Sequence, residues 1–488
     1  MSTFLSKLFP GGSSSSSSVN SDLGTMESLC KAINELGTEK PESAGEKAAE
    51  IVRKNKEIFE KKPTDVEAFL MHCDPSVGSA AMAAAIKGMF DVSAAKNNES
   101  GTDRAVEVLH HFLTGNSLVG EHLKLVPEII FPLLRNIGLY CLDKKDKPEI
   151  GQSIIAKALS VIFPIQDFSK MLTSAHSVLF ACALKTKDYA SVEPFIDVHI
   201  DEVANEKCVT DPSSDNEPVA MLSKVLSKKA HLASLSSSNA AQIPFINPKI
   251  VLEYLYNGAC VLIELKRFED ALLLLDTCIA IPAFSLQEQH IDGYKKYVLL
   301  SLLLHGRVGD TLEKQVGAKS IKAKTAEYKV FSEVKFSRKG NTHTKVEEMV
   351  INAKDKLKKD GNLELARMVV VEMKKKTILA IVKMFSSVRI TDVTDLAHLK
   401  TLQACTDLID QLVAENRITV RVEGDMLFWS EVTPVPSKED LENKMRIVDD
   451  LNLLLMDKNA CLKAGSGRLR PSVLFNDDEG LSMPPLEH

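Results

Sequence analysis

Tryptophan is almost absent from this chain, since one of its 488 residues is Trp and aromatic residues make up only 6%. So low an aromatic content argues against an aromatic-rich β-sandwich. An excess of positive charge is also lacking, because 60 Lys and Arg face 66 Asp and Glu. A strongly basic nucleic-acid binder is therefore excluded at the level of the whole chain. No run of about 18 uncharged apolar residues occurs, so the sequence predicts no transmembrane helix and no membrane partner.

Cysteine is present but lacks the spacing of a structural site. The nine cysteines are odd in number and never form a C-x-x-C pair. The sequence therefore indicates neither a disulfide framework nor a zinc ribbon. We expect reduced thiols in a protein of the cytoplasm and nucleus.

Motifs that carry chemistry are missing as well. The chain contains no H-x-H pair, no phosphate loop of the GxxxxGK[ST] type, no GxGxxG and no GxSxG. His110 and His111 are adjacent, so on a helix their side chains diverge by about 100° and would not chelate one metal together. His72, Cys73 and Asp74 are consecutive at a predicted helix end, where we favour a structural role. The sequence predicts a protein that is not an enzyme, with no catalytic residue, no cofactor and no metal.

Both ends of the chain are predicted to be disordered. Residues 1–25 contain an apolar patch too short for a signal-peptide core, followed by two glycines and six serines. Residues 464–488 carry glycine, proline and an acidic cluster at 477–479.

Helical patterns dominate from about residue 26 to residue 387, and breaks recur roughly every 15 to 25 residues. Predicted helical segments include 80–90, 104–114, 121–142, 149–162 and 170–186. Pairs of helices stacked along the chain are favoured, because each pair can bury its apolar face only against its neighbours. We therefore predict a mostly α fold that begins with a TPR-like helical-repeat solenoid.

One helix pair gives the sharpest repeat signal. Helices are expected over 250–265 and 268–280, with Ala259 on the first and Ala271 twelve residues later on the second. Small side chains at these two points let the helix axes approach closely. The spacing is close to that of a tetratricopeptide repeat, although Leu275 replaces the usual aromatic residue.

A basic stretch over 319–345 carries seven lysines and one arginine, with Tyr328 and Phe331 among them. A nucleic-acid or polyphosphate patch is one interpretation of this composition. The other is a solvated face on two short helices, which we favour because two aromatic residues are too few for a regular stacking platform.

The segment from about residue 377 to residue 432 predicts a winged helix. A helix, a short extended piece at 388–390, a second helix after Thr391 and a third helix at 402–416 come first. Strict alternation of Ile418, Val420 and Val422 and a turn at Gly424 then indicate a β-hairpin that ends near residue 432. Helix, strand, helix, helix and hairpin in this order is a variant of helix-turn-helix.

This winged helix is predicted to bind protein rather than DNA. Its third helix carries Asp407, Asp410 and Glu415, whose carboxylates would repel phosphates in a DNA groove. The outer strand of the hairpin can instead pair with a strand of another chain. Proline at Phe428 is expected to disrupt this edge pairing. The hairpin residues that we predict to bind a partner are Ile418, Val420, Val422, Phe428 and Trp429.

A last helix is predicted after Pro436, over residues 437–463. Its apolar residues recur at spacings of four and three, which makes one stripe along the helix. Since no further domain follows to cover it, the stripe is predicted to pack on partner helices rather than to fold back. The predicted contact residues are Leu441, Met445, Val448, Leu451 and Leu455.

Helical repeats that run into a winged helix and end in one more helix resemble the PCI proteins, which are scaffold subunits of the proteasome lid, the COP-nine signalosome and translation initiation factor three. The match is nearest to the signalosome branch. It rests on LKRFEDAL at 265–272, IPA at 281–283 and GYKKYVLLSL at 293–302, with GEH at 120–122 and LTSAH at 172–176 in support. The serine-rich leader and an inserted segment at 205–239 depart from the family pattern.

The resemblance implies a domain order. N-terminal helical repeats would occupy 26–245 and the PCI domain 246–432, divided into repeats at 246–365 and the winged helix at 366–432. The helix at 437–463 would join a bundle with the C-terminal helices of other subunits.

The resemblance also implies a function. The chain would be a non-catalytic scaffold of the complex that removes the ubiquitin-like modifier NEDD from cullins and so regulates cullin–RING ubiquitin ligases. The isopeptidase of that complex is a different subunit, a zinc metalloprotease of the MPN class. The implied partners are the other PCI and MPN subunits and, indirectly, cullin–RING ligases. The alternatives are a PCI subunit of the proteasome lid or of initiation factor three, and a winged-helix nucleic-acid binder.

Overall fold

The computed structural model describes residues 25–38, 40–61, 66–114, 119–163, 171–196, 202–203, 248–281, 287–309, 318–337 and 341–431, together with nine helical positions between 438 and 456. The chain forms two compact units. Unit 1 covers residues 1–380 with 396–398, and unit 2 covers 381–395 with 399–488. The domain bounds expected from the sequence stay predictions.

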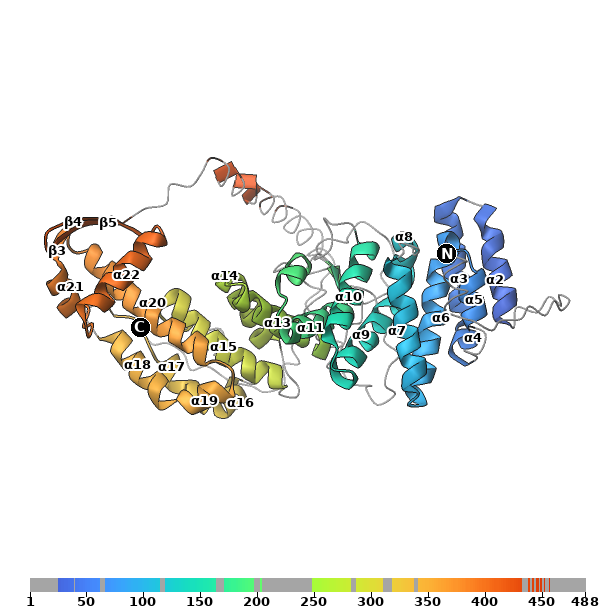
Figure 1. Ribbon diagram of the computed structural model, residues 1–488, viewed down its shortest axis with the longest axis horizontal. Coiled ribbons are helices and arrows are strands. Elements are labelled where there is room, and N and C mark those ends of the chain that lie inside the picture. The colour runs from blue at the N-terminus through green and yellow to red at the C-terminus, as the bar shows by residue number, and fades with distance from the viewer. Residues whose placement is uncertain are drawn as a thin grey trace, which may run out of the picture. The chain divides into compact units, whose positions relative to one another are not determined.

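Unit 1 is a stack of helices in which most contacts join helices that are close in the chain, such as α6 with α7, α10 with α11 and α13 with α14 (Figure 1). Its first half contains α2 (Met26–Glu35), α3 (Pro41–Lys54), α4 (Lys56–Lys61), α5 (Val66–His72), α6 (Pro75–Ala95), α7 (Glu99–Thr114), α8 (Gly120–Lys124), α9 (Pro127–Leu139), a π-helical turn (Tyr140–Lys144), α10 (Pro148–Ile162), α11 (Ser174–Thr186) and a 3₁₀ turn (Ala190–Phe195). The strands β1 (Met171–Leu172) and β2 (Glu202–Val203) pair in parallel. This arrangement confirms the predicted mostly α, stacked-helix fold.

The second half of unit 1 continues the stack. It contains α13 (Pro248–Glu264), α14 (Phe268–Ala280), α15 (Glu288–His305), α16 (Ala318–Lys324), a 3₁₀ turn (Ala326–Tyr328), α17 (Lys329–Ser332), α18 (Thr342–Asn352), α19 (Lys354–Lys359) and α20 (Leu363–Val382).

Proline marks the start of several of these helices. Pro41, Pro75, Pro127 and Pro148 each occupy the first turn, where the missing N–H costs no helical hydrogen bond. The single helix expected over 121–142 is divided at this point, because Pro127 disfavours helical backbone at the residue before it and starts α9.

Helix α6 lies at the centre of the first half of unit 1. It contacts α3, α4, α5, α7, α8 and α9, and its stretch from Ala80 to Ile86 is buried all round. Alanine dominates this stretch, so neighbouring helices can approach α6 on every side.

The predicted helix pair at 250–280 is confirmed as α13 and α14. Ala259 and Ala271 are fully buried, and the two helices pack tightly against each other. A Cβ atom at Gly258 would lie 3.3 Å from Cδ1 of Leu274 and 3.5 Å from the ring of Phe180, which shows how closely α13 approaches α14 and α11. Cys260 and Cys278 are buried here as small core residues, as expected.

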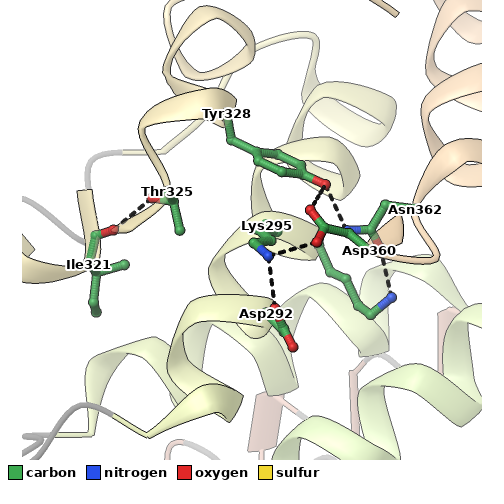
Figure 2. Close-up of polar contacts among 8 residues, drawn as sticks. Asp292, Lys295, Ile321, Thr325, Tyr328, Asp360 and Asn362 are labelled. Atoms are coloured by element: carbon green, nitrogen blue, oxygen red, sulfur yellow. Dashed lines mark hydrogen bonds and ion pairs between the residues drawn. The ribbon is translucent and has the colours of Figure 1, made fainter. Parts of the chain in front are cut away.

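Helix α15 is joined to the later helices by a network of polar side chains (Figure 2). Nζ of Lys295 lies 3.0 Å from a carboxylate oxygen of Asp292 and 3.0 Å from one of Asp360. The hydroxyl of Tyr328 donates to the other oxygen of Asp360 at 3.0 Å and accepts a hydrogen bond from Asn362 at 3.0 Å. Lys296 donates to Asn362 at 2.8 Å. The network thus ties α15, the 3₁₀ turn and the α19–α20 connection together.

Three consecutive lysines on α20, residues 374–376, are buried or form polar contacts within unit 1. Lys374 pairs with Glu347 on α18 at 3.2 Å, and Lys375 is buried. Lys376 donates to the carbonyls of Leu303 and Leu304 at 2.7 and 2.8 Å. Its charge therefore lies at the negative end of the α15 dipole.

Unit 2 is a winged helix, as predicted. It contains β3 (Ser387–Arg389), α21 (Ile390–Leu396), α22 (Leu402–Ala414), β4 (Ile418–Glu423) and β5 (Met426–Glu431). The antiparallel sheet has the order β3-β5-β4. Its helices bury Val393, Cys405, Ile409 and Leu412, and the sheet contributes a second set of buried side chains, namely Ile418, Leu427 and Trp429.

We predict that Ala259→Trp destabilises the α13–α14 pair. Because Ala259 is fully buried at a close helix contact, the indole has no room, and such overpacking costs about 1–3 kcal/mol. Urea unfolding followed by circular dichroism measures the free energy of unfolding. Ala323→Trp, at an exposed position of α16, is the matched control and should change it by less than about 0.5 kcal/mol. Equal stability of the two variants would contradict the packing described for α13 and α14.

We also predict that Asp360→Asn weakens unit 1. The substitution removes the charge that faces Lys295 and places an amide where two hydrogen bonds are accepted, so we expect a loss of about 1–3 kcal/mol in the free energy of unfolding. Thermal unfolding measures it, with Asp355→Asn at an exposed position of α19 as the control. Identical melting of both variants would show that the network adds nothing to stability.

Candidate partner-binding surfaces

The β-hairpin of unit 2 is built on a two-residue turn. Gly424 has a φ of 66°, which glycine adopts without strain, and Asp425 follows it. Backbone N–H of Ile390 donates to the carbonyl of Asp425 at 3.0 Å, so the turn is fixed to the start of α21. The glycine-based turn expected from the sequence is confirmed.

Strand β5 is the central strand of the sheet, and this corrects one expectation. Phe428 pairs with Ser387 on β3 and with Arg421 on β4. Proline at Phe428 would therefore break the sheet from within, so the prediction that it would test an outer strand was wrong. Among the described strands, β4 is the hairpin strand that lies at an edge of the sheet.

The register identifies which backbone groups of β4 face that edge. Glu423 and Met426 flank the turn, and residues that flank a two-residue turn form a hydrogen-bonded pair. Such pairs alternate along the hairpin, so the backbone groups of Val422 and Val420 point away from β5. The N–H of Trp429, opposite Val420, confirms this alternation because it donates to Ser386 on the β3 side at 3.1 Å.

The predicted hairpin residues fall into two groups. Ile418 and Trp429 are buried, and Nε1 of Trp429 donates to the carbonyl of Phe385 at 2.8 Å, so both stabilise unit 2 itself. Val420 is half-buried, whereas Val422 and Phe428 are 63% and 40% exposed. Only the latter two offer a large apolar side chain at the surface.

The predicted last helix is described at scattered positions only. Leu441, Met445 and Val448 are helical and exposed, as an uncovered stripe requires. Met456 is a further exposed apolar residue on the same segment. Leu451 and Leu455 lie outside the described residues.

Sequence reasoning missed several exposed apolar side chains next to the winged helix. Leu402 and Phe385 continue the apolar stripes of two helices in the sequence, yet both are exposed, as are Met384, Leu396 and Val413. Phe385 lies beyond the end of α20, so the helical spacing no longer fixes its direction. The apolar character of these positions was the one feature of the sequence that could have marked them as possible contact residues.

The basic stretch at 319–345 does not present its aromatic residues. Tyr328 and Phe331 are each 1% exposed, and the Tyr328 hydroxyl belongs to the Asp360 network. Lys356 on α19 pairs with Glu327 at 2.6 Å, and Lys329 with Glu333 at 3.8 Å. Stacking on nucleic-acid bases therefore has no support from these two aromatic rings.

A hollow of about 450 Å³ between α7 and α10 contains Ser153, His110 and Asp103, residue types that could suggest a hydrolase. The carboxylate of Asp103, however, accepts a hydrogen bond from Tyr140 at 2.7 Å and pairs with Lys145 at 3.0 Å. Burial, together with the bond to Asp103, raises the pKa of Tyr140 to about 12. The carboxylate is thus committed to structural partners rather than to orienting His110.

The part of the chain that the structure describes holds no group of three or more His, Cys, Asp or Glu side chains that could bind a metal ion. Asp74 of the His72-Cys73-Asp74 sequence accepts a hydrogen bond from the N–H of Ser76 at 2.9 Å and caps α6. Among the described helices, none is both long enough and apolar enough to cross a membrane.

Known proteins match the chain along most of its length. The family profile described as COP9 signalosome complex subunit 3, N-terminal helical repeats, matches residues 42–216 and 224–317. The COP9 signalosome complex subunit 3 of Caenorhabditis elegans is 62% identical over 496 aligned positions, which cover 100% of this chain and 99% of the relative.

More distant relatives bear the same name. The Drosophila melanogaster protein is 21% identical over 61% of this chain and 61% of its own length, and the Arabidopsis thaliana protein is 24% identical over 53% and 63%. The helical stack, the family profile and the full-length similarity agree, and the chain belongs to the COP9 signalosome complex subunit 3 family.

Proposed function

We propose that this chain is a non-catalytic scaffold subunit of a COP9 signalosome, the complex that removes the ubiquitin-like modifier NEDD from cullins. The observation that carries the proposal is the 62% identity to a COP9 signalosome complex subunit 3 along the full chain. A stack of helices followed by a winged helix supports it, because such a fold offers long surfaces and strand edges for other subunits.

The proposal assigns bond cleavage to another subunit. In the described part of the chain, the carboxylates of Asp103 and Asp74 have structural partners. The partners are the other PCI and MPN subunits of the complex and, through them, cullin–RING ligases. Since no cysteine pair has the spacing of a disulfide framework, we place the protein in the cytoplasm and nucleus.

Purification of the tagged chain from its source cells, followed by mass spectrometry, tests the proposal. We expect signalosome subunits, including the MPN metalloprotease, in stoichiometric amounts. Recovery of proteasome-lid or initiation-factor subunits without a cullin deneddylase would overturn it. Retention of RNA or DNA at about 150 mM salt, with a steep salt dependence, would favour a nucleic-acid binder instead.

Two surfaces are proposed to hold the chain in the complex. The first is the outer edge of β4, where the backbone groups of Val420 and Val422 are directed outward by the register. A partner strand added there would gain main-chain hydrogen bonds. The second is the apolar stripe of Leu441, Met445 and Val448, which would be covered by partner helices.

We predict that Val422→Pro weakens assembly without unfolding unit 2. The ring removes an N–H that points away from β5, so the bonds between β4 and β5 persist, while a partner strand loses one hydrogen bond worth about 0.5–1.5 kcal/mol and meets the bulk of the ring. Co-purification with partner subunits measures assembly, and circular dichroism checks the fold. Val422→Thr keeps the N–H and is the control, which should assemble normally. Normal assembly of the folded proline variant would exclude the β4 edge as a contact.

We predict that Met445→Asp weakens incorporation into the complex. Burial of a methionine side chain contributes roughly 1.5–3 kcal/mol, and a carboxylate in its place adds a desolvation cost. Melting of the isolated chain should not change, because Met445 is exposed in it. The neighbouring exposed residue supplies the control, Glu442→Gln, which should leave incorporation unchanged. Equal incorporation of both variants would mean that the stripe is not a contact surface.

A further inference from the structure

Two thiols lie together where α2 meets the connection between α5 and α6. Cys30 is on α2 and Cys73 directly follows α5. Both side chains are buried, with exposed fractions of 5% and 4%. Their thiols share a hydrogen bond, which places the two sulfur atoms next to each other although they come from different elements.

Asn34, one helical turn after Cys30, fixes the backbone on both sides of Cys73. Its Nδ2 donates to the carbonyl of His72 at 2.8 Å, and its Oδ1 accepts from the N–H of Asp74 at 2.9 Å. The same Nδ2 lies 3.8 Å from Sγ of Cys30, within reach of a weak hydrogen bond. The side-chain amide of Asn34 therefore holds the backbone at Cys73 close to Cys30.

Helix α6 closes the site from the other side. A Cβ atom at Gly78 would lie 2.2 Å from Sγ of Cys73 and 3.3 Å from Cγ2 of Ile33, so glycine is what leaves room for the sulfur. Asp74 caps α6 and fixes the turn that carries Cys73. Sγ of Cys73 is thus confined between α6 and Cys30.

The two thiols are electronically unequal. The hydrogen bond from Cys73 is the main cause that lowers the pKa of Cys30, and the same bond raises the pKa of Cys73. At two other buried cysteines burial is the main influence on the pKa, and it raises the pKa of Cys141 to about 11 and that of Cys182 to about 12. Because the thiolate is the nucleophile of thiol chemistry, we assign the first attack to Cys30.

We propose that Cys30 and Cys73 are a redox modification site, at which a peroxide forms a reversible disulfide that fastens α2 to the α5–α6 connection. The thiolate of Cys30 attacks one peroxide oxygen, the O–O bond breaks, and Cys30 becomes a sulfenic acid while the leaving oxygen takes up a proton. The sulfur of Cys73 then attacks the sulfur of Cys30 and releases water. In total two thiols lose two electrons and two protons, and hydrogen peroxide is reduced to two waters.

The position of α2 gives a route for the oxidant. Among the described residues α2 is the first helix, and it is held by one apolar face of Met26, Leu29, Cys30 and Ile33. Local opening of this helix, at one end of the described stack, exposes its buried face without unfolding the rest. A disulfide formed at this point would oppose that opening.

Mass spectrometry of the intact, full-length chain tests the proposal. The reduced protein is treated with a small molar excess of hydrogen peroxide, remaining thiols are alkylated, and the protein is digested without reductant. We expect a peptide cross-linked through Cys30 and Cys73, about 2 Da lighter than the sum of the two thiol peptides, that disappears with dithiothreitol. The oxidised chain should also melt at a higher temperature than the reduced one.

The pair of Cys141 and Cys182 is an internal control within the same sample. Both lie against Gly151, whose Cβ atom would be 3.1 Å from Cβ of Cys141 and 3.4 Å from Sγ of Cys182, yet burial raises the pKa of both thiols. We expect this pair to oxidise at least several-fold more slowly. Any of three results would overturn the proposal. Cys30 and Cys73 could remain open to alkylation after peroxide treatment, the two pairs could oxidise at equal rates, or oxidation could lower the melting temperature.

Two variants complete the test. Cys30→Ser should abolish the cross-link and the shift in melting temperature on oxidation, whereas Cys182→Ser should leave both unchanged. If Cys30→Ser does not fold, the comparison of the two pairs in the unmodified chain still decides the outcome.

Discussion

Close approach of helices through small side chains is the constraint on which unit 1 depends. No helix of the stack can bury its apolar face alone, so each must come near enough to its neighbours to exclude water. The alanines of α6 allow this on every side, and Ala259 and Ala271 allow it between α13 and α14. Bulk at any of these points would separate two layers and open the core between them.

Much of this architecture could be read from the sequence, because helical spacing and breaks are local signals. The α13–α14 pair and the winged-helix order are examples of features that follow from local patterns. The division at Pro127 and the strand order were not predicted. The central position of β5 depends on its pairing with residues 387–389, far away in the chain, and alternation within the hairpin contains no information about it.

The candidate surfaces were predictable in kind but less so in detail. Alternation placed Ile418, Val420 and Val422 on one face of the hairpin, but it could not show that the unit itself buries Ile418 on that face. Likewise, the sequence does not show what the lysines of 374–376 do, whereas in the fold two of them bond to Glu347 and to the carbonyl end of α15. Charge and hydrophobicity acquire a functional meaning only once burial is known.

The outward backbone of β4 has a consequence for the life of the chain in the cell. An uncovered strand edge is a template for unwanted pairing with any other chain, and proteins usually protect such edges. Copies made in excess over their partners would therefore stay unassembled, and they would be prone to aggregation and to capture by chaperones and proteases. A partner strand on this edge, as proposed above, would therefore also protect the chain from these losses.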